Sequence, residues 1–195
     1  MRLGVNMRNA SIIIGLCLVL DFASAQELPS KAHEALSARF KHWTFRPAHL
    51  PSPCDAPDRQ AILLSAVQKC DLNRDRTTDY AVAVTTGKDS EMVEYFLALV
   101  SRGDSYDVFI IDSARNYLGA GERLLRIIRA GDSTAFFGDE DEVAKHGKLV
   151  NRDRMIVFPT DALEISPGCE VHYSGLEYDV YVFIRGRFLN FAAAD

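Results

Sequence analysis

One stretch of the chain carries oxygen-bearing side chains at the spacing of cation ligands. Asp71, Asn73, Asp75 and Asp79 stand two, two and four positions apart, between two apolar runs. Calcium takes six to eight oxygen ligands, and carboxylates at alternate positions converge when a short loop curls around the ion. With the backbone carbonyl of Thr77 as a further ligand, the pattern predicts a calcium-binding loop.

The flanking sequence separates this loop from an EF-hand. The twelfth position counted from Asp71 is Val82, where an EF-hand has glutamate, and apolar runs typical of strands replace its two helices. The segment resembles instead the calcium-binding loop of the FG-GAP repeats in integrin α-type propellers, and the single D-x-N-x-D-x-x-x-D hairpins of small exported bacterial proteins of unknown function. The resemblance implies the same five ligands. A propeller is excluded, because only one such loop is present.

Two arginines in the loop oppose cation binding. The family has glycine at the sixth position, where the backbone needs a positive φ, and this chain has Arg76. Arg74 and Arg76 also bring two positive charges beside the ion. The alternative is a loop without a cation, in which Asn73 and Asp75 form Asx turns and the arginines pair with the carboxylates at the loop ends. Both interpretations are open from the sequence.

The N-terminus predicts export. Two arginines precede an apolar run at residues 12–20, and an Ala-x-Ala motif ends at Ala25. This is the pattern of a secretory signal peptide, and the run is about half the length needed to span a bilayer. We expect residues 1–25 to be removed and residues 26–195 to form a single globular domain, periplasmic or secreted and not attached to a membrane.

Charge and missing motifs exclude several classes of function. The net charge of −5 argues against nucleic acid or anionic lipid as a partner. The five histidines lack zinc-ligand spacing, and neither a nucleotide-binding motif nor a nucleophile motif is present. We therefore expect no cofactor besides calcium and no catalytic residues, and a protein or small molecule as partner.

Three cysteines, Cys54, Cys70 and Cys169, remain after signal cleavage, so one intramolecular disulfide at most can form. Cys70 shares pleat parity with Ala66, which predicts a buried thiol in the apolar layer. That leaves Cys54 and Cys169 as the expected disulfide. A bridge between Cys54 and Cys70 is the competing arrangement.

The apolar pattern predicts an α+β fold with a mostly antiparallel sheet of about six to nine strands. A helical spacing of apolar residues favours a short N-terminal helix within residues 27–42. Residues 124–128, bracketed by glycines, favour a short central helix, with a strand as the alternative. Runs rich in β-branched and aromatic residues predict strands joined as hairpins at 62–70, 80–85, 93–100, 106–111, 155–158, 162–165, 170–173, 178–184 and 188–191.

We expect an exported, non-catalytic binding or interaction protein in which the acidic loop acts as a structural or regulatory cation clip. Two other classes are open. A small hydrolase would use clustered acids, either Asp139 to Glu142 or Asp161 with Glu164, which would have to face each other in a cleft. An inhibitor of an extracellular enzyme would present the loop Gly138 to Gly147 as a rigid plug.

Overall fold

A computed structural model describes residues 28–46, 66–88, 91–115, 123–136, 149, 155–167 and 177–194. These residues form one helix, α1, and eleven strands, and every strand pairing among them is antiparallel. The predicted signal peptide, the cysteines at 54 and 169 and the acidic stretch 138–147 lie outside the described residues.

The elements have the following bounds: α1 Ser30–Arg39, β1 Thr44–Phe45, β2 Val67–Cys70, β3 Asp79–Thr86, β4 Val93–Arg102, β5 Ser105–Arg115, β6 Arg123–Ile128, β7 Ser133–Phe136, β8 Met155–Val157, β9 Ala162–Pro167, β10 Glu177–Ile184 and β11 Arg187–Ala194. The prediction of a mostly antiparallel β-protein with a short N-terminal helix is confirmed. The described strands outnumber the expected six to nine, because the sequence does not predict β1 or β7 and predicts β6 only as the alternative to a helix. Residues 170–173, predicted as a strand, lie outside the described residues.

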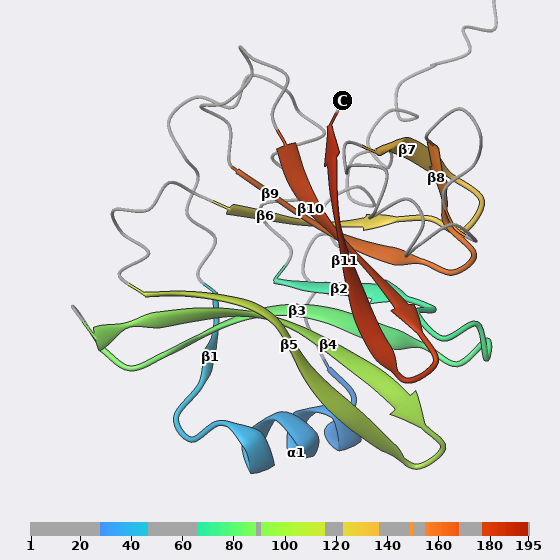
Figure 1. Cartoon of the computed structure of the whole chain (residues 1–195). Coiled ribbons are helices and arrows are strands. Elements are labelled where there is room, and N and C mark those ends of the chain that lie inside the picture. The colour runs from blue at the N-terminus through green and yellow to red at the C-terminus, as the bar shows by residue number, and fades with distance from the viewer. Residues whose placement is uncertain are drawn as a thin grey trace, which may run out of the picture.

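The strands form two sheets, which Figure 1 shows stacked on each other with α1 on the outer face of the first. The first sheet has the order β1-β3-β4-β5, with β2 also paired to β3. The second has the order β6-β9-β10-β11-β7-β8. Helix α1 covers the first sheet by burying Ala32 and Leu36, one turn apart. Within the described residues, no helix is long and apolar enough to cross a membrane.

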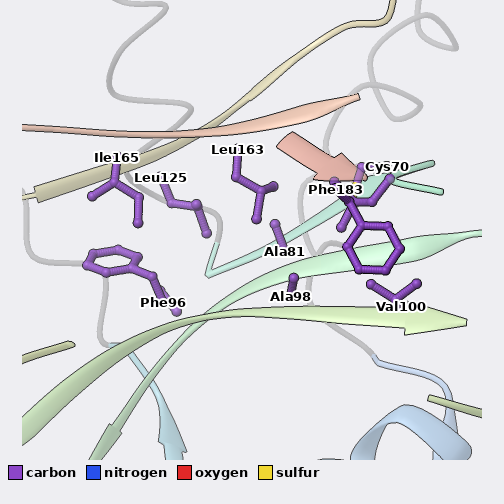
Figure 2. Close-up of a cluster of buried hydrophobic side chains, with 11 residues drawn as sticks. Cys70, Ala81, Phe96, Ala98, Val100, Leu125, Leu163, Ile165 and Phe183 are labelled. Carbon is purple, nitrogen blue, oxygen red and sulfur yellow. The ribbon is translucent and has the colours of Figure 1, made fainter. Parts of the chain in front are cut away.

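Strand β3 is buried on both faces, which explains its uninterrupted apolar run. Ala81 and Ala83 face the second sheet, and Val82 and Val84 pack with α1 on the opposite side. The core between the sheets is drawn in Figure 2, where the Phe96 ring is directed from the first sheet toward Ile165 of the second. A further cluster, which includes Ile156, Phe158, Val180 and Phe191, covers the other face of the second sheet.

The predicted central helix is wrong, because residues 123–128 form β6. Leu125 and Ile127 face the core between the sheets, and Ile128 lies in the cluster on the opposite face. A strand buried on both faces has nearly the same run of apolar residues as a buried helix. The hydrogen bonds to β9 select the strand, and a pairing with so distant a segment cannot be read from the local sequence.

Side chains from the first sheet close the outer edge of β6. Gln68 Nε2 donates to the Leu125 carbonyl over 2.5 Å, and Arg46 Nη1 donates to the Arg123 carbonyl over 2.5 Å. Arg46 also forms an ion pair with the buried Glu94, with 2.9 Å between Nε and Oε1. These bonds satisfy carbonyl groups that a free strand edge would leave open.

Cys70 is a buried free thiol, as its pleat parity predicts. Burial raises the pKa of this thiol, and the nearby carboxylates of Asp79 and Asp161 raise it further. In the unfolded chain the thiol ionises near pH 9.0, whereas in the native protein it stays protonated. Above pH 9.0 the thiol of the unfolded chain loses its proton while that of the native protein keeps it. The free energy of unfolding therefore falls as the pH rises through and above 9.0, and Cys70 has no such effect at lower pH.

We expect the stability gap between wild type and Cys70→Ala to shrink by about 1.4 kcal/mol between about pH 8 and pH 10. Urea unfolding of both proteins at the two pH values measures the gap. Comparing the two chains cancels the titration of tyrosines and lysines, which both contain. A gap that stays the same at both pH values would show that Cys70 ionises equally in the native and unfolded states.

Candidate functional site

The predicted calcium loop connects β2 to β3 and has a strained backbone. Arg74 and Arg76 have φ values of 62° and 65°, in the left-handed region. The positive φ that the resemblance implies at the sixth position is therefore present, although arginine occupies the position. For a residue with a Cβ atom this conformation costs about 1–2 kcal/mol.

Asx turns shape the exposed part of the loop. The Asp75 N–H donates to Asn73 Oδ1 over 3.0 Å, and the Thr77 N–H donates to Asp75 Oδ1 over 2.7 Å. The Asn73 amide also donates to Asp75 Oδ2 over 2.8 Å. The Thr77 N–H holds the pKa of Asp75 below its usual value. The turns expected of a loop without a cation are thus present, and they leave Asn73 and Asp75 side by side.

Asp79, the predicted closing ligand, is fully buried and anchors the loop to the first sheet. Its Oδ2 accepts the Leu72 N–H and its Oδ1 accepts the Ser101 N–H, each over 2.7 Å. Burial raises the pKa of Asp79, while the two N–H donors act in the opposite direction. The carboxylate thereby satisfies two buried backbone donors, and its role as a cation ligand stays a prediction.

Asp71 has one carboxylate oxygen in use and one without a partner. The Arg76 N–H donates to Oδ2 over 3.1 Å. Oδ1 is closed off from solvent, and no hydrogen-bond donor reaches it. A buried carboxylate oxygen without a donor is unfavourable, because it has lost its hydrogen bonds to water and has formed none within the protein.

The second sheet holds the backbone of Asp71 through Asp161. The Asp71 N–H donates to Asp161 Oδ2 over 3.0 Å, and the Asp161 N–H donates to the Asp71 carbonyl over 3.2 Å. Asp161 also accepts the Arg129 guanidinium over 2.8 Å and the Ala130 N–H over 3.0 Å. Sequence reasoning missed this contact, since the two aspartates are 90 positions apart and no local pattern joins them.

Asp161 and Glu164, the acids considered for a hydrolase, are not brought together. Glu164 forms an ion pair with Arg126, with 2.5 Å between the charged atoms, and Asp161 pairs with Arg129. Asp161 immediately precedes β9, and Glu164 on β9 has the parity of Ala162, opposite to that of Leu163. Leu163 faces the core between the sheets and Ala162 faces the other cluster, so Glu164 is directed away from the core between the sheets.

Among the described residues, no group of three or more histidines, cysteines or acidic residues is placed to hold a metal ion. A calcium ion in this loop would therefore need the amide oxygen of Asn73, the carbonyl of Thr77 and water beside the carboxylates of Asp71 and Asp75. All of these are the hard oxygen ligands that calcium prefers.

No family model, curated protein or solved structure matches the chain. The resemblance to FG-GAP loops therefore rests on the residues of the loop itself.

Replacing Arg76 by glycine tests the backbone strain. We expect Arg76→Gly to stabilise the protein by about 0.5–1 kcal/mol, because glycine adopts a positive φ without a Cβ clash. Arg76→Ala removes the same charge but keeps the Cβ atom, so it should give no such gain. Urea unfolding without calcium measures both. Equal stabilities of the glycine and alanine variants would show that charge, and not strain, is the dominant effect at this position.

Proposed function

We propose that this chain is an exported, non-catalytic binding protein in which the hairpin loop 71–79 binds a calcium ion. The ion would hold the loop in one conformation, and we call this loop with its ion the calcium clip. The observation that carries the proposal is the buried oxygen Oδ1 of Asp71, which no hydrogen-bond donor reaches. A bound cation would satisfy this oxygen directly. The ion would also neutralise Asp71 and Asp75, and would fix a loop that both sheets already hold.

Two features of the loop are compatible with a bound cation. The backbone already has the left-handed turns at Arg74 and Arg76 that curl the loop. The side chains of both arginines are exposed, so solvent and salt screen their charges. Their opposition to a cation is correspondingly weaker than that of buried charges.

The buried acids are occupied by hydrogen bonds and ion pairs within the protein, which favours a binding function over catalysis. Asp79 accepts two backbone N–H groups, and Asp161 and Glu164 are each paired with an arginine. A general acid or base needs a carboxyl that can exchange a proton with a substrate. We therefore propose that the chain recognises a protein or a small molecule at its surface. The calcium ion would stabilise the conformation of that surface.

A thermal melt tests the clip. The mature chain is treated with EDTA and then melted with and without calcium, in parallel with Asp75→Ala. At 100 times the dissociation constant, calcium should add about 2.7 kcal/mol, which raises the melting temperature of a chain of this size by about 5–10 °C. Asp75→Ala should show no calcium-dependent shift.

Asp104→Ala is the matched control, because it removes one exposed acid from the turn between β4 and β5. It should keep the full calcium shift. If wild type and Asp75→Ala melt alike with and without calcium, the loop is not a calcium site.

A further inference from the structure

We propose that Asp161 is a positioning residue for the calcium loop and couples ion binding there to the turn between β6 and β7. The inference rests on the proposed function, which identifies Asp71 as a calcium ligand. Asp161 immediately precedes β9 of the second sheet, whereas Asp71 follows β2 of the first sheet. The contact therefore joins the two sheets at the loop.

The carboxylate of Asp161 is matched to three donors. Its Oδ2 accepts the Asp71 N–H over 3.0 Å and the Arg129 guanidinium over 2.8 Å, and its Oδ1 accepts the Ala130 N–H over 3.0 Å. The residue is only 8% exposed. An ionised carboxylate presents acceptors alone, so it can serve all three donors, and an amide cannot.

These contacts fix the backbone of Asp71 on both sides. Its N–H donates to the Asp161 carboxylate and its carbonyl accepts the Asp161 N–H over 3.2 Å. The position of the Asp71 side chain, and of its unpartnered Oδ1, is thus set from the second sheet. Because coupling between two sites is reciprocal, an ion that holds Asp71 in place must also order the Asp161 contacts with Arg129 and Ala130.

Asp161→Asn tests the proposal, with Glu164→Gln as the matched control. Glu164 lies on β9, is buried and forms an ion pair with Arg126 of β6, as Asp161 does with Arg129 just beyond β6. The Glu164–Arg126 pair joins two strands of the second sheet, whereas Asp161 also accepts the Asp71 N–H from the first sheet. Calcium chloride is titrated into each mature chain by calorimetry. We expect Asp161→Asn to bind calcium about 10–100-fold more weakly, and Glu164→Gln to bind it as wild type does.

Amide exchange followed by NMR supplies the second measurement. Calcium should slow exchange of the Ala130 N–H in wild type and in Glu164→Gln, and should leave it unchanged in Asp161→Asn. Wild-type calcium affinity in Asp161→Asn, or an equal loss in both variants, overturns the proposal. If Asp161→Asn does not fold, Arg129→Met removes one donor at an exposed position and should change affinity in the same direction by a smaller factor.

A wild-type chain that binds no calcium refutes the proposed function and the coupling to the ion. The positioning of Asp71 is then decided without calcium, through the Arg76 N–H that donates to its carboxylate. Faster exchange of this N–H in Asp161→Asn than in Glu164→Gln supports the positioning role. Equal exchange rates in the two variants overturn it.

Discussion

Replacing Asp79 by alanine is expected to lower the free energy of unfolding by about 2–5 kcal/mol. The carboxylate is fully buried and accepts the N–H groups of Leu72 and Ser101. Alanine leaves both donors inside the protein without an acceptor, and the loop loses its bond to β4. Urea unfolding at neutral pH without calcium measures the loss independently of any ion.

Asp79→Asn and Asp104→Ala are the comparison variants for this result. Asparagine keeps one oxygen acceptor but turns an NH2 group toward the second backbone donor, so its loss should be at least about half that of alanine. Asp104 is exposed, and its replacement should change stability by less than about 0.5 kcal/mol. A value for Asp79→Ala as small as that of Asp104→Ala would contradict the anchoring role.

Replacing Phe96 by alanine is expected to cost about 3–5 kcal/mol. The ring is fully buried between the two sheets (Figure 2). Two guanidinium groups lie over it, with Arg46 Cζ at 6.0 Å and Arg123 Cζ at 5.4 Å from the ring centroid. Alanine therefore leaves a cavity and also removes two cation–π contacts, each worth about 0.5–1 kcal/mol.

Phe96→Leu separates these two contributions. Leucine fills most of the volume but offers no π face, so its cost should be about 1–2 kcal/mol. Thermal and urea unfolding measure both variants. If Phe96→Leu proves as unstable as Phe96→Ala, the ring contacts with Arg46 and Arg123 outweigh the filling of the core.

The sequence predicted the features that depend on local periodicity. The helix α1 follows from the spacing of Ala32 and Leu36, and β3, β4 and β10 follow from runs of β-branched and aromatic residues. The resemblance of the loop implies a positive φ at the sixth position, and Arg76 has one although it is not glycine. In each case, the residues that form the pattern are neighbours along the chain.

Features that depend on distant pairing were not predictable in the same way. Residues 123–128 fit both helix and strand, and only pairing with β9 selects the strand. The contact of Asp79 with Ser101 depends on the pairing of β3 with β4, and the contact of Asp71 with Asp161 depends on the packing of one sheet against the other. A buried acid indicates that donors must surround it, but the sequence does not say which donors they are.

A calcium titration of the EDTA-treated mature chain, followed by calorimetry, tests the calcium clip most directly. The proposal predicts saturable binding of about one ion per chain, with a dissociation constant at or below the 10⁻⁴ to 10⁻³ M that is typical of extracellular calcium modules. Asp71→Ala and Asp75→Ala should each abolish it. No saturable binding by wild type up to about 10 mM calcium, or unchanged binding in both variants, would contradict it.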